Sequence, residues 1–294
     1  MKKICFLFML VASVTSFSQE ISLDDKGVDK HSYKPIPESH IMYKKMLWRM
    51  IDLREKQNQP FFAQGREVTQ VIIDAVKKGK IQPWKSDSLS DGQPLEVKDF
   101  LERLIIPAGD DGFGGEEELG FFDDESDPFN EGTDGGGDVA STEKPKNKNN
   151  SQTFYYEGKD LWQLEIKENL IFDKQRSVRV HDIQALTIVI PADHPDNVKG
   201  IEEIVASFSY KELIENVFTN NPEAIWYNPY NDKEHKSLAD AFELRLFHSY
   251  LTKINNPTNE RITDIYGGDP EVGIRASHLE EEKMLEIEHN FWSY

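Results

Sequence analysis

The stretch that decides the fold of this chain reads LWRMIDLREKQNQPFF over residues 47–62. Apolar residues in and just before it recur at spacings of three and four, a period that is typical of one buried face of a helix. These residues are Tyr43, Met46, Leu47, Met50 and Leu53. Arg49 and Asp52, or Asp52 and Lys56, can pair across one helical turn. Pro60 disfavours helical backbone at the preceding residue. We therefore predict a helix that begins near His40 and ends before Pro60.

Two shorter helices are predicted further along the chain. The first runs from Glu67 to Lys78, because an apolar face is followed by lysines in the last turn and then by Gly79. The second covers residues 95–106, where apolar residues again recur at three and four. Residues 19–36, which come before the first predicted helix, are polar and predict an extended arm. Residues 37–106 are therefore predicted to form an N-terminal helical region.

The first residues of the chain predict export. Met1-Lys2-Lys3 is a short basic start, residues 4–17 are mostly apolar, and small residues precede a cleavage site before Gln19. A membrane anchor is the competing interpretation, but the apolar run is shorter than the roughly 20 residues that a spanning helix needs. The only cysteine, Cys5, lies inside this predicted signal peptide of residues 1–18 and opens the apolar run, whereas a lipidated cysteine would follow it. The mature chain is therefore expected to lack a lipid anchor, disulfides and thiol chemistry.

The charge balance of the chain excludes some partners. Its formal net charge is −19. Such a chain repels nucleic acid and anionic membrane surfaces, because both carry negative charge themselves. No segment after the signal peptide is apolar for long enough to span a membrane. We expect an exported protein that works in an aqueous compartment and whose charge suits a basic partner.

An acidic segment separates the two halves of the chain. Residues 110–138 contain twelve acidic residues, eight glycines and no basic residue, and a lysine- and asparagine-rich piece follows over residues 144–150. Such a composition cannot bury enough apolar surface to offset the entropy of ordering. We predict that residues 107–153 are a disordered linker. Two alternatives stay open: a calcium loop, although the EF-hand spacing is absent, and a partner-binding segment that uses Phe113, Phe121, Phe122 and Phe129.

Residues 154–294 begin with strand patterns. Phe154 to Tyr156 fits a short strand, and residues 161–167 alternate only partly. The alternation from Val178 to Thr187 slips at His181-Asp182, which a β-bulge would explain. Residues 186–190 are apolar on both faces, as expected for a central strand.

Two helices are predicted to close the chain. Ser237 begins a capping-box pattern before an apolar helix that extends to Leu251, and Ser277 begins a second one before the final helix. Helices and strands thus alternate irregularly. The fold class predicted for the chain is α+β, with an N-terminal helical region, a small mixed or antiparallel sheet over residues 154–294 and C-terminal helices.

The sequence carries no enzymatic signature. Phosphate-binding loops, dinucleotide fingerprints, nucleophile elbows and zinc-protease motifs are missing, and the eight histidines are scattered without local metal-ligand spacing. The pair His181-Asp182 at the predicted bulge is the most distinctive candidate for chemistry, and it is weak alone. We therefore predict no catalytic residue, no cofactor and no metal.

One enzymatic alternative depends on carboxylates near aromatic residues. Hydrolysis of a sugar needs two carboxylates across one cleft. Acidic residues that lie close to Trp162 and Phe172 in the sequence are Asp160, Glu165, Glu168 and Asp173. They keep open the hypothesis of a soluble periplasmic hydrolase or glycan-binding protein, which predicts that these carboxylates converge in a deep cleft. An ordinary folded domain with surface charges is the simpler interpretation.

Four blocks of distinctive residues occur in order along the chain. The first is WRMIDLREKQNQP (48–60), and the second is IKENLIFDKQRSV (166–178). The third comprises NPYND (228–232) together with residues 242–250, and the last is EIEHNFW (286–292). These blocks resemble the GldN (PorN) family of the type IX secretion system. Residues 107–153 are longer and more acidic than the family pattern, and the segment from 191 to 228 follows it loosely, as in a divergent paralogue. We call residues 47–62 the signature stretch.

The resemblance implies a non-enzymatic, periplasmic structural subunit of the secretion and gliding machinery. Family members associate with a GldK-type outer-membrane lipoprotein in large rings, and they contact the periplasmic part of a GldM-type stalk. The resemblance brings no catalytic residue, cofactor or nucleic-acid partner. Our candidates for partner binding are the charged and aromatic residues of the first two blocks: Trp48, Arg49, Asp52, Arg54, Glu55, Asp173, Lys174 and Arg176.

Overall fold

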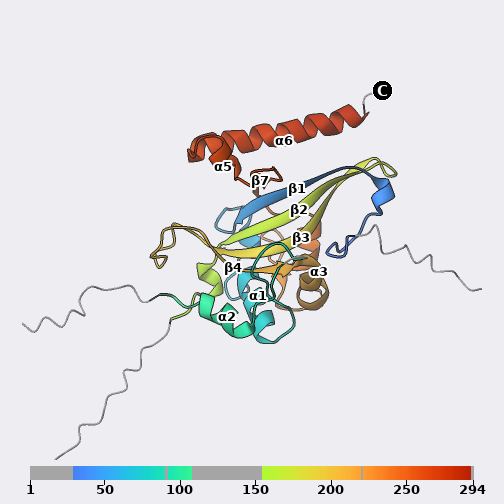
Figure 1. Cartoon of the computed structure of the whole chain (residues 1–294). Coiled ribbons are helices and arrows are strands. Elements are labelled where there is room, and N and C mark those ends of the chain that lie inside the picture. Colours follow the sequence, from blue (N-terminus) through green and yellow to red (C-terminus); the bar gives the residue numbers. More distant parts are fainter. Residues whose placement is uncertain (1–28, 90–91, 108–153, 220, 293–294) are drawn as a thin grey trace, which may run out of the picture.

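The computed structural model describes residues 29–89, 92–107, 154–219 and 221–292 (Figure 1). The predicted signal peptide and residues 108–153 of the predicted linker lie outside these residues, so both stay predictions. In the described part of the predicted arm, residues 29–36 form no helix or strand. No helix among the described residues combines the length and the apolar character needed to cross a membrane.

Five strands form one antiparallel sheet in the order β4-β3-β2-β1-β7 (Figure 1). The strands are β1 (Ile41–Asp52), β2 (Gln163–Asp173), β3 (Val178–Ile190), β4 (Glu203–Ser209) and β7 (Tyr250–Ile254). A separate two-stranded ribbon pairs β5 (Ile225–Trp226) with β6 (Lys236–Ser237). The α+β class and the antiparallel sheet are therefore confirmed, but the sheet also includes β1, which comes from the region predicted to be helical.

The helix predicted from His40 to Pro60 is wrong, because this segment forms strand β1. The strand lies between β2 and β7 in the sheet, and its second half is buried on both faces: Leu47 and Ile51 on one face, Trp48 and Met50 on the other. A strand that is apolar on both faces has no clean alternation. Its apolar residues therefore also matched a helical period. The pairing with β2, more than a hundred residues later, outweighs the local pattern.

The strand predicted over residues 178–190 is confirmed, and its β-bulge lies at another residue. In the β2–β3 pair Lys167 is opposite Ala185 and Glu168 is opposite Ile183, so Gln184 is the extra residue. The bulge predicted at His181-Asp182 is therefore misplaced. The extra residue at Gln184 lets both Ile183 and Leu186 face the core. The strand predicted at Phe154–Tyr156 is reduced to one bridge, between Ile105 and Tyr155.

The larger hydrophobic core lies between the sheet and the shorter helices, three of which are labelled below the strands in Figure 1. These helices are α1 (Val68–Lys77), α2 (Val97–Arg103), α3 (Tyr210–Leu213) and α4 (Leu238–Glu243). Short turns of 3-10 or π helix also occur at Glu38–His40, Gln59–Phe61, Gly158–Asp160 and Ile214–Phe218. The helices predicted over residues 67–78 and 95–106 are thus confirmed to within a few residues.

The helix predicted from Ser237 to Leu251 is correct only in its first part. Ser237 does cap α4, because its Oγ accepts a hydrogen bond from the Asp240 backbone N–H at 3.0 Å. The helix ends at Glu243, and Arg245 takes a left-handed backbone conformation with φ of 51°. The chain then turns into β7, whose residues pair with the edge of β1. Long-range pairing again overrides an apolar helical pattern.

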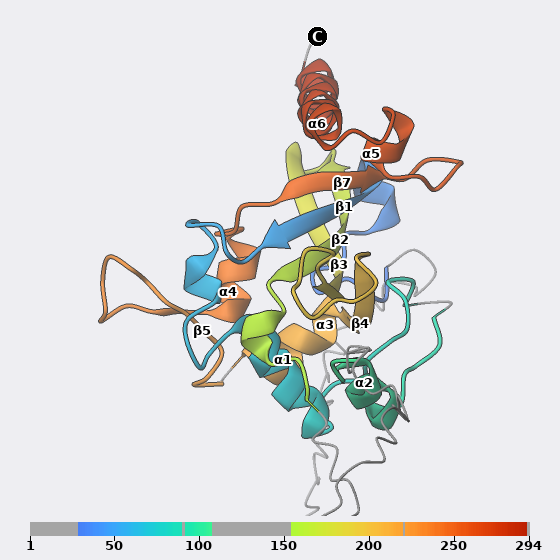
Figure 2. The ribbon, with the colours of Figure 1, turned by 90° about the vertical axis from the view of Figure 1, so that its left-hand side faces the viewer.

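A long C-terminal helix, α6 (Pro270–Trp292), follows the short helix α5 (Ile262–Ile265) and lies beyond β7 (Figure 2). The start predicted at Ser277 is wrong, because the helix begins at Pro270. Ser277 is instead a buried helix residue whose Oγ donates a hydrogen bond of 2.8 Å to the Leu251 carbonyl oxygen. A smaller second core joins α6 to the sheet through residues that include Leu47, Leu170 and Met284.

Candidate functional site: the signature strand and its ion network

One face of the sheet carries two separate hydrophobic cores with charged residues between them. Ile51 of β1 and Leu164 of β2 belong to the larger core, whereas Leu47 and Leu170 belong to the smaller one under α6. Side chains two residues apart on a strand share a face. Glu168, between Leu164 and Leu170, therefore lies on this face at the boundary between the two cores, as does Arg49 between Leu47 and Ile51.

Glu168 is the centre of a buried ion network. Its side chain is fully buried. One carboxylate oxygen accepts a hydrogen bond from Arg49 Nε at 2.9 Å and lies 3.1 Å from His181 Nδ1. The other oxygen accepts from Arg245 Nη1 at 2.5 Å. Arg49 also reaches Glu281 of α6, with 2.7 Å between Nη1 and Oε1. The network therefore links β1, β2, β3, α6 and the turn after α4.

The pKa values of this network follow from its burial and its charges. Burial alone would raise the pKa of Glu168, but the hydrogen bond with His181 and the charges of Arg245 and Arg49 hold that pKa well below its usual range. Burial lowers the pKa of His181, and this effect outweighs the attraction of Glu168. A neutral His181 still donates from Nδ1 to an ionised carboxylate. The chemistry of the cluster is thus that of a fixed ion pair.

Trp48 lies on the opposite face of β1 and is tied to the loop after α1. Its Nε1 donates a hydrogen bond of 2.6 Å to Asp87 Oδ2. Lys253 Nζ lies 4.3 Å from the indole ring centroid, a cation–π contact, and Lys167 Nζ lies 3.3 Å from the same carboxylate. Although burial alone would raise the pKa of Asp87, the Trp48 hydrogen bond and Lys167 lower it overall. Trp48 therefore positions this loop from inside the fold.

The charged residues that end β1 make local contacts. Asp52 accepts hydrogen bonds from the Arg54 backbone N–H at 2.8 Å and from its Nη2 at 2.9 Å. The Arg54 guanidinium also lies 4.4 Å from the Trp162 ring centroid. Glu55 Oε2 lies 2.6 Å from His248 Nδ1. These contacts fix the turn after β1, and the side chains of Arg54 and His248 are about half exposed.

Asp173, Lys174 and Arg176 form the tight connection between β2 and β3. Asp173 Oδ1 accepts from the backbone N–H groups of Gln175 at 2.8 Å and Arg176 at 3.3 Å. The Lys174 backbone N–H donates to the His40 carbonyl oxygen at 2.9 Å. The Arg176 side chain is 75% exposed. The eight candidate residues therefore do not converge in one site, and most of them stabilise the sheet and its turns.

The comparison with known families identifies the chain. The sequence model of the family described as "Gliding motility associated protein GldN" matches residues 36–293, nearly the whole chain. The chain belongs to the GldN family. Comparison with curated protein sequences gave no match. Membership makes this GldN chain a component of the gliding-motility and type IX secretion machinery, and it implies a structural rather than an enzymatic role.

In this GldN chain the four carboxylates that could have formed a hydrolase or glycan-binding cleft do not lie together. Glu165 and Glu168 are three residues apart on β2 and face opposite sides of the sheet. Asp160 accepts a hydrogen bond from the Glu157 backbone N–H in a short helical turn, and Asp173 caps the β2–β3 connection. No group of three potential metal ligands occurs among the described residues. The arrangement expected of a hydrolase or glycan-binding cleft is therefore not found there.

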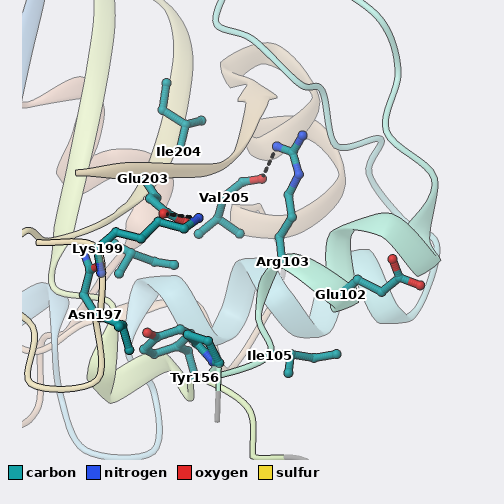
Figure 3. Close-up of a pocket in the computed structure, with 12 residues that line it drawn as sticks. Glu102, Arg103, Ile105, Tyr156, Asn197, Lys199, Glu203, Ile204 and Val205 are labelled. Atoms are coloured by element: carbon teal, nitrogen blue, oxygen red, sulfur yellow. Dashed lines mark hydrogen bonds and ion pairs between the residues drawn. The ribbon is translucent and has the colours of Figure 1, made fainter. Parts of the chain in front are cut away.

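A cavity of about 500 Å³ lies beside β4, at the end of the described segment that reaches Pro107 (Figure 3). Arg103 turns to the backbone, where its Nη1 donates to the Val205 carbonyl oxygen at 3.0 Å, and Lys199 pairs with Glu203 at 2.6 Å. Glu102 extends away from these residues (Figure 3). Arg103 and Lys199 are thus engaged within the protein and Glu102 lies apart from both, so the cavity shows no paired acid and base that converge on one point.

Sequence reasoning missed the partners that make Glu168 a hub. Glu168 stands in the second sequence block, and His181 lies at the predicted bulge, but Arg245 was not among the candidate residues. Its apolar surroundings resembled a continuous helix. An arginine in the middle of an apolar stretch was the one available hint, since a buried charge needs a partner.

Asp182, next to this network, is expected to reduce stability at neutral pH. Its carboxylate accepts from Ser32 Oγ at 2.7 Å and from Gln184 Nε2 at 2.6 Å, and burial raises its pKa to about 6. The folded state thus binds this proton more tightly than the unfolded state does, so ionisation at neutral pH opposes folding. Asp182→Asn should raise the free energy of unfolding by about 1–3 kcal/mol at neutral pH.

Urea unfolding of wild type and variant at pH 7.5 and at pH 5 checks this expectation. The difference should shrink at the lower pH, because wild-type Asp182 is then largely protonated. Asparagine can keep both contacts, since the Ser32 hydroxyl can accept as well as donate. Glu282→Gln, exposed on α6, serves as the control. A less stable Asp182→Asn variant, or a difference independent of pH, would contradict the argument.

Proposed function

We propose that this GldN-family chain is a non-enzymatic subunit of a periplasmic ring in the type IX secretion and gliding machinery. A GldK-type lipoprotein holds it at the inner face of the outer membrane, and a GldM-type stalk contacts it from the inner-membrane side. The single observation that carries this proposal is the family match over residues 36–293. The ring and its partners are what the family resemblance implies.

The distribution of charge supports a structural role. The charges of the buried ion network around Glu168 are paired within the chain. The carboxylates considered above for sugar hydrolysis face different directions. A group that is fixed in an ion pair holds neighbouring elements in place, whereas an acid–base catalyst needs access to a substrate.

Helix α6 supplies apolar surface for assembly. Several of its large side chains remain about half exposed, namely Ile274, Leu279, Leu285 and Trp292. Exposed apolar residues that recur along one element are typical of a contact surface between proteins. In a ring, such a surface would be covered by a neighbouring subunit or by the lipoprotein.

The predicted export signal agrees with the proposed location. Because the only cysteine lies in the predicted signal peptide, attachment to the outer membrane would come from the lipoprotein partner rather than from a lipid on this chain. We therefore expect the chain in the membrane fraction of cells that contain the lipoprotein and in the periplasmic fraction of cells that lack it.

Affinity purification from detergent-solubilised envelopes tests the proposal. A C-terminally tagged chain, expressed from its own locus, should co-purify with a GldK-type lipoprotein, and electron microscopy of the eluate should show rings. An unrelated exported protein with the same tag is the matched control. Recovery of the tagged chain as a free periplasmic monomer, with no lipoprotein in the eluate and no change of fraction when the lipoprotein gene is deleted, would overturn the proposal.

A further inference from the structure

A cavity of about 670 Å³ lies between the end of the signature stretch and the β5–β6 ribbon. Its lining comes from two segments that are far apart in the sequence: Lys56, Gln59, Pro60, Ala63, Gln64, Arg66, Tyr227 and Pro229. In Figure 2 the loop after β5 projects from the body of the molecule. The first and third sequence blocks singled out above therefore meet at one surface.

The wall from the signature stretch is held rigidly. The Pro60 carbonyl oxygen accepts a hydrogen bond of 2.9 Å from the Tyr227 backbone N–H, which joins the two segments. The fully buried Asn58 donates to the Asp52 carbonyl oxygen at 2.7 Å and accepts from the His248 backbone N–H at 2.7 Å. The cavity is thus preformed on an ordered support, which lowers the entropy cost of binding.

The opposite wall is a loop that displays an aromatic residue. The Tyr227 ring stacks on His235 with centroids 4.9 Å apart, and its hydroxyl donates to Asp232 Oδ1 at 3.1 Å. The Tyr230 backbone N–H donates to Asn228 Oδ1 at 3.0 Å, and the Tyr230 side chain is 95% exposed. Ordered loops that present exposed tyrosine are common at protein interfaces, where tyrosine is enriched among the residues that dominate affinity.

The cavity is cationic although the chain is strongly acidic. Lys56 and Arg66 are exposed, no acidic residue lines the cavity, and neither cation has an ion-pair partner among the described residues. The carboxylates closest in sequence are engaged elsewhere: Glu55 pairs with His248, and Glu67 accepts from the Gly65 backbone N–H at 3.0 Å. Two unpaired cations at one surface of a chain with net charge −19 indicate a site for a negatively charged partner.

We propose that this cavity docks an acidic, extended segment of a partner protein. Lys56 and Arg66 pair with carboxylates of that segment, the side-chain amides of Gln59 and Gln64 bond to its backbone, and Tyr230 packs against one of its proline or aromatic side chains. Grooves lined by aromatic side chains bind extended, proline-rich segments in several families of peptide-binding domains. This inference does not depend on the identity of the ring partners proposed above.

Fluorescence anisotropy with the mature full-length chain tests the proposal. The probes are two fluorescein-labelled peptides of about twelve residues, one with repeats of Glu-Pro-Glu-Phe and one in which glutamine replaces glutamate. We expect the glutamate peptide to bind at least about tenfold more tightly, with affinity that falls as salt rises from about 50 to about 300 mM. The double variant Lys56→Gln/Arg66→Gln should weaken binding about tenfold, and Tyr230→Ala about threefold or more.

The matched control is Lys80→Gln/Lys98→Gln, which removes two exposed lysines from other surfaces and should leave binding unchanged. Circular dichroism should show that all variants unfold at the wild-type temperature, since every replaced residue is exposed. Equal affinity for the two peptides, no binding of either one, or no effect of the Lys56/Arg66 change would overturn the proposal. A second copy of the chain would be the occupant if neither peptide bound and the Lys56→Gln/Arg66→Gln variant lost a self-association that wild type shows in analytical ultracentrifugation. That result would also overturn the proposal.

Discussion

Replacement of Glu168 by glutamine lowers the free energy of unfolding by about 3–5 kcal/mol at neutral pH. The variant leaves Arg49 and Arg245 in the boundary between the two cores without the carboxylate that both of them contact. A glutamine side chain has only one acceptor oxygen, which is neutral. Its NH₂ group would face the guanidinium groups, which are themselves hydrogen-bond donors. Urea unfolding followed by circular dichroism, with wild type and variant in parallel, measures the loss.

Glu282→Gln is the control for this variant, because it makes the same chemical change on the exposed side of α6. We expect it to alter stability by less than about 0.5 kcal/mol. A Glu168→Gln variant as stable as this control would show that the network contributes nothing net. In that case the desolvation of four charged groups would fully cancel their attraction.

The pH dependence of the Glu168 effect has a defined sign. Its folded-state pKa is depressed, so the folded state binds the proton less tightly than the unfolded chain does. Its contribution is therefore complete above the unfolded pKa of about 4.3 and declines as pH falls below that value. The difference between wild type and Glu168→Gln should shrink in the same range. His181, whose pKa is lowered by burial, separately destabilises the fold as pH drops below about 6.5.

Replacement of Phe242 by alanine lowers the free energy of unfolding by about 3–5 kcal/mol. Phe242 on α4 is 1% exposed and is the centre of an aromatic cluster in the larger core. Its ring centroid lies 5.1 Å from that of Phe61 in the signature stretch, 5.6 Å from Phe218 and 5.7 Å from Phe247. Rigid rings on several elements cannot collapse into the resulting cavity, so the loss includes a cavity cost as well as the lost burial.

Thermal and urea unfolding measure this loss. Phe154→Ala is the control, because Phe154 is 65% exposed and the same truncation there should cost less than about 1 kcal/mol. Phe242→Leu should recover part of the loss, since it refills some of the volume. If Phe242→Ala cost no more than Phe154→Ala, the cluster would not be a cooperative part of the core.

Local sequence patterns predicted the secondary structure correctly where an element depends mainly on its own residues. The cap at Ser237, the lysines that end α1 and the strand from Val178 to Ile190 were all readable from the sequence. They failed where pairing partners are distant. Residues 41–52 and 250–254 have helical apolar spacing, but each becomes a strand because the edge of a neighbouring strand satisfies its backbone hydrogen bonds.

The candidate site shows the same limit. The sequence singled out Trp48, Arg49 and Asp173 as a group, and the structure places them on different faces and at different ends of the sheet. Conversely, Arg49 and Arg245 meet at Glu168 although long stretches of chain separate them. Residue type predicted that these charges need partners, but it did not say which ones.

The sequence by itself determined the family, because ordered blocks of unusual residues extend along almost the whole chain and need no structure to be recognised. It also determined the acidic balance and the absence of any cysteine after the predicted signal peptide. Only the tertiary structure decided that the signature stretch is a central strand with a buried ion network beside it, and that its end meets the β5–β6 loop. The physical reason is that strand pairing, ion pairing and cavities arise between residues distant in the chain, where local periodicity carries no information.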